Sequence, residues 1–322
     1  MPSIHKEGLP RLRELIKCGA AKRTEDGGSY PSYYFPDIIR KNIFRGMLVT
    51  NSNSAFVGSI PEHYDKYLGP LIFEEYSKDF ANRLNIPDDG NLLEVAAGTG
   101  LATRHMRNVL HRDIRITVTD LNEPMLEIAK RKFPTLNNMH FQTADAIDLP
   151  FEDSSFDGIA CQFGIMFFPD KQKGVNEAYR VLKPGGEYVF SVWDSYAHNP
   201  LIKLVNDTLL NIFPENPPSF LDVPLNYYQI DEIKRILQVG GFGDIEIAIL
   251  PRTIQCKRVE DVPLGFIMGN PLSLQISELG GNVTEVIETI SNEIVQHFGN
   301  PPFEAPMQAI VFKAHKPNTI SI

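Results

Sequence analysis

Three acidic residues follow three short apolar runs of the chain. The acids are Glu94, Asp120 and Asp145, and the runs before them are Leu92–Leu93, Ile114–Thr119 and Met139–Thr143. Short apolar runs of this kind are typical of buried parallel strands, and open α/β sheets bind ligands at the carboxyl ends of such strands. A carboxylate at that edge can accept hydrogen bonds from ribose hydroxyls, each contributing roughly 1.5–3 kcal/mol. The sequence therefore predicts a nucleoside site.

A glycine-containing loop separates the first acid from a helical pattern. The loop is Ala96-Ala97-Gly98-Thr99-Gly100, and the helical run after it extends from Leu101 to His111. Because glycine has no Cβ, Gly98 and Gly100 are expected to let backbone N–H groups approach a ligand. The N-terminus of the following helix favours anionic groups. The loop is thus predicted to be a ligand cradle, for which phosphates and carboxylates are both candidates.

The neighbouring residues distinguish two kinds of nucleotide ligand. Asp120 lies about twenty residues after the glycines, as the acid does in dinucleotide sites. The phosphate fingerprint G-x-G-x-x-G, counted from Gly98, would need its third glycine at Thr103, and Glu94 places a negative charge where a pyrophosphate would lie. A ligand with an ammonium group and a ribose but no phosphate suits these residues better. S-adenosylmethionine is such a ligand, and a nicotinamide-dependent oxidoreductase stays open as the alternative.

Three segments resemble the motifs of a known family. Residues Leu93 to Gly100 are similar to the first motif of the class I S-adenosylmethionine-dependent methyltransferases, in the branch that includes ubiquinone and menaquinone biosynthesis C-methyltransferases. Asp145 to Phe151 and Arg180 to Gly186 resemble the motifs D-A-x-x-L-P-F and R-V-L-K-P-G-G of the same class. The usual first motif has glycine where this chain has Ala96, a change that adds a methyl group. The resemblance extends from about Ser59 to Lys316.

The resemblance implies that two further residues lie near the cofactor. In the resembling methyltransferases a tyrosine at the position of Tyr64 approaches the methionine end of the cofactor, and Gln162 lies beside it. Tyr64, Tyr67 and Tyr76 also recur at helical spacing. Packing is therefore an open interpretation for Tyr64 and the favoured one for Tyr76.

The adenine is expected at the ends of the second and third strands. The resemblance implies that Leu121 and Met125 flank the ring, that Asp145 receives its amino group, and that the backbone N–H of Ala146 meets a ring nitrogen. Asp120 has the alternative role of a helix cap. The predicted cofactor-binding residues are Tyr64, Glu94, Ala96, Gly98, Gly100, Asp120, Leu121, Met125, Asp145, Ala146 and Gln162.

The order of the elements predicts an α/β fold with a seven-stranded, doubly wound, mostly parallel sheet. Five strands come first, and an antiparallel pair at Asp244–Leu250 and Met307–Ala314 completes the sheet, as in the resembling class. We expect three parts. Residues 1–50 form an N-terminal extension of unknown role, residues 51–200 a cofactor-binding core, and residues 201–322 the C-terminal completion of the sheet with a helical substrate cap. Two lid helices in the core are expected to meet at a bend at Gly69-Pro70.

Composition excludes several functions. The net charge of −9 and the pI near 5.4 argue against a nucleic-acid surface. The three cysteines lack a C-x-x-C pattern and no histidines and carboxylates show ligand spacing, so neither a disulfide nor a metal site is expected. No apolar run approaches the roughly 18 residues of a membrane span, and the first residues lack an apolar signal core. We expect a cytoplasmic protein, whose oligomeric state the sequence leaves open.

Methyl transfer from a sulfonium needs alignment more than a dedicated nucleophile. Alignment and desolvation can supply roughly 7–11 kcal/mol of the barrier. A base is needed only if the acceptor must lose a proton, and the conceivable bases are His63, His140, Asp194 and His198. No catalytic residue is assigned. The aromatic loop from Phe163 to Asp170 favours a small, apolar or aromatic methyl acceptor, although these residues could instead be core, and a catalytically silent S-adenosylmethionine-binding protein stays open.

Overall fold

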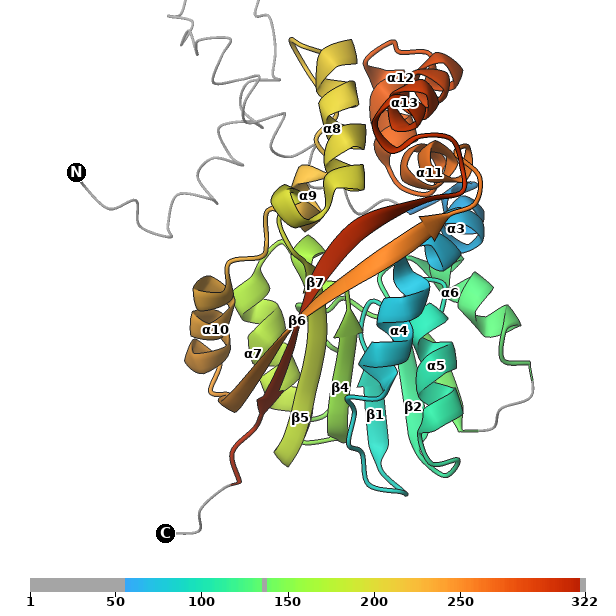
Figure 1. The fold of residues 1–322 in the computed structure, drawn as a ribbon. Helices are drawn as coiled ribbons and strands as arrows, with labels where there is room; N and C mark the ends of the chain where they lie inside the picture. The colour runs from blue at the N-terminus through green and yellow to red at the C-terminus, as the bar shows by residue number, and fades with distance from the viewer. Residues whose placement is uncertain (1–55, 135–137, 319–322) are drawn as a thin grey trace, which may run out of the picture. The chain divides into compact units, whose positions relative to one another are not determined.

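Residues 56–134 and 138–318, the part of the chain that this computed structural model describes, are built around a seven-stranded sheet (Figure 1). The strand order is β3-β2-β1-β4-β5-β7-β6. The strands are β1 (Asn91–Glu94), β2 (Arg115–Asp120), β3 (Met139–Thr143), β4 (Phe156–Gln162), β5 (Leu182–Trp193), β6 (Gly243–Cys256) and β7 (Phe303–His315). Strands β1 to β5 pair in parallel, and β7 is antiparallel to both of its neighbours. The predicted sheet is confirmed, whereas the predicted extension at residues 1–50 lies outside the described residues.

Helices cover the two faces of this sheet. On one face lie α4 (Glu74–Ala81) and α5 (Leu101–Val109), and on the other lie α7 (Lys171–Val181) and α10 (Ile230–Val239) (Figure 1). Neighbouring residues of a strand point to opposite faces. In β5, Glu187 therefore points toward the segment after α4, while Tyr188 packs on Phe242 beyond α10, at 5.8 Å between ring centroids. Because helices cover both faces of the sheet, the sequences of the central strands are nearly continuous apolar runs.

The expected bend in the lid is not observed. The π-helix η1 (Tyr64–Phe73) joins α3 (Ile60–His63) to α4 without a break, and Pro70 lies inside it. Proline normally ends an α-helix because it lacks an N–H group and its ring collides with the carbonyl of residue i−4. The wider π turn, in which the N–H of Glu74 donates to the carbonyl of Gly69, leaves room for the ring. The lid is therefore one continuous helical segment.

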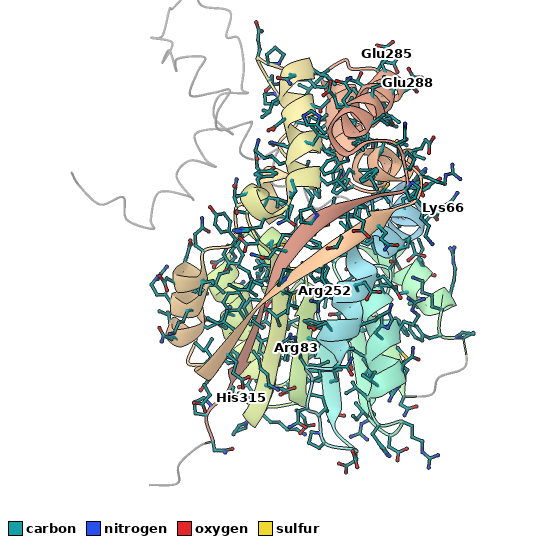
Figure 2. The ribbon with its side chains drawn as sticks, in the orientation of Figure 1. Lys66, Arg83, Arg252, Glu285, Glu288 and His315 are labelled. Atoms are coloured by element: carbon teal, nitrogen blue, oxygen red, sulfur yellow. The ribbon has the colours of Figure 1, made fainter. Side chains whose placement is uncertain are left out.

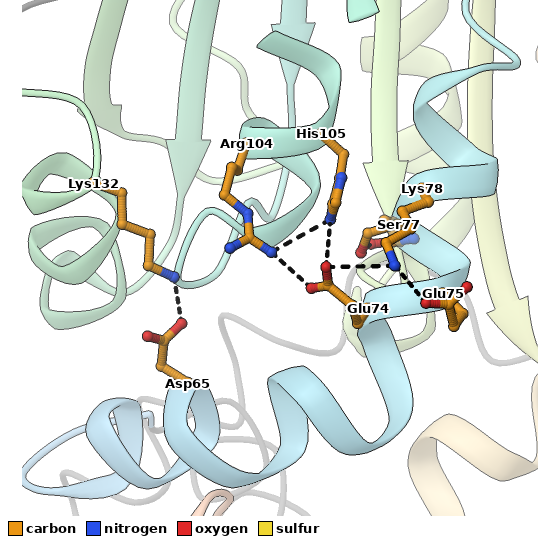
Figure 3. Close-up of polar contacts among 9 residues, drawn as sticks. Asp65, Glu74, Glu75, Ser77, Lys78, Arg104, His105 and Lys132 are labelled. Carbon is orange, nitrogen blue, oxygen red and sulfur yellow. Dashed lines mark hydrogen bonds and ion pairs between the residues drawn. The ribbon is translucent and has the colours of Figure 1, made fainter. Parts of the chain in front are cut away.

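Ion pairs fix this lid to the rest of the structure (Figure 3). Near its start, Asp65 pairs with Lys132, the residue that follows α6 (Glu123–Arg131). Where η1 passes into α4, Glu74 lies 2.7 Å from Arg104 and 3.1 Å from His105 of α5. The lid is thus tied at both ends to the two helices that follow β1 and β2.

A third connection joins α4 to the edge of the sheet. Asp79 pairs with Arg83 at 2.5 Å and with Arg252 of β6 at 3.1 Å, and Figure 2 shows the two arginines near each other. Because β6 is the last strand of the sheet, this contact links the lid segment with the C-terminal part of the chain.

Further helices gather beyond one end of the sheet (Figure 1). They are α8 (Pro200–Ile212), α9 (Asp222–Leu225), α11 (Asp261–Pro263), η4 (Leu264–Met268), α12 (Leu272–Glu278) and α13 (Val283–Phe298), and the short 3-10 turns η2 (Ile165–Phe167) and η3 (Tyr196–His198) follow β4 and β5. Whether this cap forms a part separate from the core at residue 200 stays a prediction.

One buried ion pair joins the lid segment to the sheet. Glu187 is 3% exposed, and its carboxylate lies 2.7 Å from Nζ of Lys313 and accepts a 2.6 Å hydrogen bond from the N–H of Asn85. Lys313 Nζ also donates to the carbonyl oxygen of Arg83 at 3.1 Å. The pair therefore connects β5, β7 and the chain just after α4.

We expect Glu187→Ala to lower the free energy of unfolding by about 3–5 kcal/mol, because it leaves the largely buried Lys313 without its carboxylate. Urea denaturation, followed by the fluorescence of the single tryptophan, Trp193, measures the change. As a control, Glu127→Ala removes an exposed pair with Lys130 of the same 2.7 Å length and should cost less than about 1 kcal/mol. Similar losses in the two variants would contradict this account.

Candidate cofactor site

A cavity lies at the carboxyl ends of β1, β2 and β4, beneath the lid. Nine of the eleven predicted cofactor-binding residues line it: Tyr64, Ala96, Gly98, Asp120, Leu121, Met125, Asp145, Ala146 and Gln162. Glu94 lines a smaller adjoining cavity, which shares Tyr64, Ala96, Gly98 and Gln162 with the larger one. Gly100 is not among the residues that line either cavity. The structure thus brings ten of these residues together, and their roles toward a cofactor stay predictions.

Asp120 connects β2 with the glycine loop. Its Oδ2 atom accepts a 2.8 Å hydrogen bond from the N–H of Gly98, and its Oδ1 atom accepts one of the same length from the N–H of Asn122. The second bond closes a turn before α6, whose N-cap is Asn122, so Asp120 is not itself the helix cap considered as the alternative. The side-chain amide of Asn122 also donates to Oδ1 at 3.4 Å, so of the roughly four hydrogen bonds that a carboxylate can accept, about one remains for a ribose hydroxyl. The turn and a ligand-binding role are therefore compatible in this residue.

Three N–H groups of the glycine loop are hydrogen-bonded within the protein. The N–H of Gly98 is bound to Asp120, that of Ala97 to the carbonyl of Thr119 at 2.9 Å, and that of Gly100 to the carbonyl of Ala97 at 3.0 Å. These bonds fold the loop against β2 instead of opening it to an anion. Gly100 itself adopts φ +78° at the start of α5, and a Cβ there would lie 2.9 Å from Cβ of Ala129. It allows α5 and α6 to pack closely.

Ala96 occupies a backbone conformation that favours glycine. Its φ is +55°, so the alanine costs more than the volume of its methyl group. Gly164, after β4, makes room for that methyl: a Cβ at Gly164 would lie 2.5 Å from Cβ of Ala96 and 2.8 Å from Sγ of Cys161. The departure from the usual motif is therefore accommodated by a second glycine opposite it.

Glu94 is a buried acid that is hydrogen-bonded to α5, the helix after the glycine loop. It is 2% exposed, and its Oε2 atom accepts a 2.6 Å hydrogen bond from the hydroxyl of Thr103 in α5. Burial raises the pKa of Glu94 to about 8, with the negative charge of Asp120 adding to the effect and the Thr103 bond opposing it. Burial also raises the pKa of Asp120. Lysine and arginine are absent from the main causes of both shifts, so among the described residues these acids have no strong cationic partner.

Gln162 carries an unused donor at the boundary of the two cavities. Its Oε1 atom accepts a 2.6 Å hydrogen bond from the hydroxyl of Ser77 in α4, which fixes the orientation of the amide. Its buried Nε2 atom has no hydrogen-bond partner among the described residues. A buried donor without a partner costs free energy, and a ligand oxygen in the cavity would satisfy it.

The tyrosines of the lid have different surroundings. Tyr64 lines the cavity and also stacks on Phe73, with 5.1 Å between ring centroids, so both interpretations of this residue find support in its contacts. Burial, with a contribution from nearby Asp120, raises its pKa and keeps the phenol neutral. Tyr76 is 2% exposed and packs edge-on against Trp193. Its position agrees with the packing role favoured for it.

The expected adenine region combines an exposed and a buried apolar side chain. Leu121 is 56% exposed although it lines the cavity, whereas Met125 is buried beneath the loop, 3.5 Å from where a Cβ of Gly98 would lie. Asp145 is exposed, and its Oδ1 atom accepts a 3.1 Å hydrogen bond from the N–H of Ile147. Leu121 and Met125 line the same cavity as Asp145 and Ala146.

None of the four conceivable bases lines the described cavities. Asp194 is 7% exposed and is bound by the amide of Gln308 at 2.7 Å, while His198 is exposed at 3.4 Å from Asp194. His140 bonds to Gln142 on the exposed part of β3, and the ring of His63 bonds to a carbonyl of the lid. The site therefore supplies alignment and burial without a side-chain base among these four.

The sequence analysis misses several cavity residues. Asn122 could have been found from its place two residues after Asp120, a spacing typical of a polar turn. Phe56, Phe220 and Asn270 carry no local signal, because they reach the cavity from segments far apart in the chain. Only long-range packing brings these three to the cofactor residues.

The residues present fit S-adenosylmethionine better than a nucleotide with phosphates. Two buried acids favour a ligand with positive charge, and the N–H groups of Ala97, Gly98 and Gly100 are already hydrogen-bonded within the protein. Asp120 would hold the ribose, and Glu94 with Gln162 would surround the methionine end. Together with the strand order, this cradle defines the class of the protein: it has the fold of the class I S-adenosylmethionine-dependent methyltransferases.

Comparison with known proteins identifies the family. Residues 53–214 match the model of the ubiE/COQ5 methyltransferase family, and the chain belongs to this family. The demethylmenaquinone methyltransferase of Staphylococcus epidermidis is 33% identical over 134 residues, which are 41% of this chain and 56% of that protein. The chain thus spans about half the length of that relative. The enzyme of the same name from Staphylococcus haemolyticus is 34% identical over 203 residues, 59% of this chain and 84% of that protein.

A solved structure supports the fold independently. The phosphoethanolamine N-methyltransferase 2 of Haemonchus contortus, solved with S-adenosylhomocysteine, superposes with a TM-score of 0.50. The alignment covers 80% of this chain and 57% of that chain at 18% identity. At this identity the likeness concerns the fold alone.

We expect Gly164→Ala to destabilise the protein by about 1–3 kcal/mol, because its Cβ would collide with Cβ of Ala96. Ala96→Gly should be neutral or stabilising by up to about 1 kcal/mol, since it relieves the left-handed alanine. The double variant should recover part of the loss, the remainder arising from the contact with Cys161. Thermal unfolding of the four proteins measures the coupling. Strictly additive effects would contradict the proposed contact between residues 96 and 164.

We expect Glu94→Gln to flatten the pH dependence of stability. Between the ordinary pKa of 4.5 and about 8, folded Glu94 keeps a proton that the unfolded chain releases. The free energy of unfolding of the natural protein should therefore fall as the pH rises through this range, by at most about 1.4 kcal/mol per pH unit from this group. Glutamine has no such proton, so the variant should gain relative stability from pH 5 to pH 8. Parallel urea-denaturation curves at all pH values would contradict this.

Proposed function

We propose that this protein transfers a methyl group from S-adenosylmethionine to a small, flat, apolar acceptor, for which a quinol ring is the first candidate. The observation that carries the proposal is the pair of buried acids, Glu94 and Asp120, beside the loop whose Gly98 N–H donates to Asp120. Such a site stabilises a ligand with an ammonium group and a sulfonium and repels a pyrophosphate.

The second end of the cavity supports an apolar acceptor. Its lining is largely aromatic and aliphatic: Phe56, Leu68, Ile72, Phe73, Phe163, Met166, Phe167, Trp193, Phe220, Leu225 and Phe266. Phe56, Phe167 and Phe220 contact one another with ring centroids 5.7–6.3 Å apart. A flat organic molecule could bury its faces against these rings. The names of the relatives, demethylmenaquinone methyltransferases, suggest a quinone precursor.

Methyl transfer from a sulfonium does not require a nucleophilic side chain. Bound S-adenosylmethionine supplies a methyl group already activated by the positive sulfur. The chain would hold the ribose at Asp120, orient the methionine end with Glu94 and Gln162, and close the site with the lid from Tyr64 to Phe73. Excluding water and aligning the two reactants can supply roughly 7–11 kcal/mol. An acceptor that loses a proton would release it to solvent after the methyl group has moved.

No helix within residues 56–134 and 138–318 is long and apolar enough to cross a membrane. The proposal concerns the activity only, and the cellular location and oligomeric state stay expectations.

We expect Asp120→Ala to lower the affinity for S-adenosylmethionine at least tenfold, since about 1.5–3 kcal/mol comes from each charged hydrogen bond to the ribose. Isothermal titration with S-adenosylmethionine and, separately, with NAD measures this. Asp148→Ala is the matched control, because Asp148 is exposed after β3 and does not line the cavity. Unchanged affinity in Asp120→Ala, or tight binding of NAD, would overturn the assignment.

The pH dependence of binding gives a second measure. A cationic ligand favours the ionised form of Glu94, so binding of S-adenosylmethionine should release a proton and strengthen from pH 6 to about pH 8.

Turnover of radiolabelled S-adenosylmethionine on a panel of quinols and phenols then tests methyl transfer. Tight binding without turnover of any acceptor would favour a catalytically silent cofactor-binding protein.

A further inference from the structure

Two irregular helices form a roof opposite the cofactor cradle. The π-helices η1 and η4 pack through glycines: a Cβ at Gly265 would lie 2.9 Å from Leu68, and one at Gly269 would lie 3.0 Å from the backbone nitrogen of Tyr64. Since side chains cannot separate the two helices here, the chain after η4 is held directly against the lid. π-Helical turns are found frequently at functional sites.

Asn270 follows this contact and is buried in the cavity wall. It is 3% exposed, lines the large cavity, and lies among apolar neighbours such as Phe266 of the roof. Its Oδ1 atom accepts a 3.1 Å hydrogen bond from the N–H of Leu272 at the start of α12. Since a backbone N–H requires an acceptor, this bond fixes which end of the amide is oxygen. The Nδ2 atom makes no hydrogen bond to the described residues and is left as a donor.

Within the roof, Tyr64 is a predicted cofactor residue, whereas Asn270 lines only the large cavity. Glu94, Asp120 and Gln162 lie at the carboxyl ends of strands, so a nucleoside bound to them covers the sheet side of the cavity. The roof then faces the remaining space. The neighbouring wall at Phe220 is held to α12 by hydrogen bonds from the N–H groups of Ser219 and Phe220 to Gln275. Asn270 thus belongs to the part of the cavity lining that the predicted cofactor residues leave free.

We propose that Asn270 positions the methyl acceptor by donating a hydrogen bond from Nδ2 to an oxygen atom on the acceptor ring. This inference rests on the proposed function and assigns the acceptor a chemical feature: an aromatic ring that carries a hydroxyl or carbonyl oxygen. In an apolar pocket, one fixed donor selects a single orientation of a flat molecule, and a site built around such a donor discriminates against analogues that lack the oxygen.

A purely structural role is the competing explanation, because Asn270 also caps α12. The chain contains a matched control for that role. Asn282 accepts a hydrogen bond from the N–H of Thr284 at the start of α13, with the same residue spacing and the same 3.1 Å length, on the exposed surface. Serine can replace asparagine as a cap, so Asn270→Ser and Asn282→Ser both keep the capping oxygen. In the cavity, the first variant replaces the Nδ2 donor by a hydroxyl that lies one bond closer to the backbone and no longer reaches the position of Nδ2.

The experiment compares two probes on the protein saturated with S-adenosylhomocysteine, which cannot donate a methyl group. The probes are 1,4-naphthalenediol, kept under anaerobic conditions, and naphthalene, which has the same rings without oxygen. We expect Asn270→Ser to weaken binding of the diol about tenfold, since a lost hydrogen bond to a buried donor costs on the order of 1–3 kcal/mol. Binding of naphthalene should change less than about twofold, and Asn282→Ser should bind both probes like the natural protein.

Each other outcome decides against the proposal. Equal weakening of both probes by Asn270→Ser would indicate that the cavity has lost its shape, and unchanged binding of the diol would leave Asn270 only its cap. Failure of the natural protein to bind the diol, while S-adenosylmethionine binds as expected, would overturn this inference and leave the methyltransferase assignment intact. Failure to bind S-adenosylmethionine itself would remove the proposed function and this inference with it.

Discussion

The hydrogen bond from the N–H of Gly98 to the carboxylate of Asp120 is the constraint on which the site depends. It joins the loop after β1 to the end of β2, and it holds a negative charge in a place that water hardly reaches. Glu94 adds a second acid below the same loop. Leaving two acids buried without a strong cation among the described residues costs stability. A site of this kind is explained by a positively charged ligand that recovers part of that cost on binding.

The lid and the roof follow from the same need for burial. A cationic nucleoside interacts strongly with the acids only if water is kept out, because the effective dielectric constant sets the strength of the attraction. The π-helix η1 covers the loop, and ion pairs at Asp65 and Glu74 hold it to the helices after β1 and β2. Glycines 265 and 269 let η4 lie directly on this lid. The C-terminal helices thus complete an enclosure whose floor is the edge of the sheet.

The sequence predicts the floor of the site well and its roof poorly. Strand ends are readable because each acid follows a short apolar run, and the strand order makes Glu94, Asp120 and Asp145 converge. Five cofactor positions come from one loop and its neighbouring strand ends, so local pattern is enough. Asn270 and Phe220 lie far along the chain and carry no such pattern. Their place in the cavity depends on helix packing, which hydrophobic periodicity does not specify.

Where the sequence analysis is wrong, a local rule has been overridden by a tertiary contact. Gly69-Pro70 reads as a helix break, yet the surrounding ion pairs and the contact with η4 stabilise a π turn that accepts the proline. The glycine loop alone is similar to a phosphate-binding loop, yet Asp120 accepts a hydrogen bond from the N–H of Gly98, which agrees with the predicted ligand without phosphate. The second case changes the chemistry as well as the geometry. An acid that occupies the loop's own donor turns a motif shared with phosphate-binding folds into one that selects positive charge, and no count of glycines alone distinguishes the two.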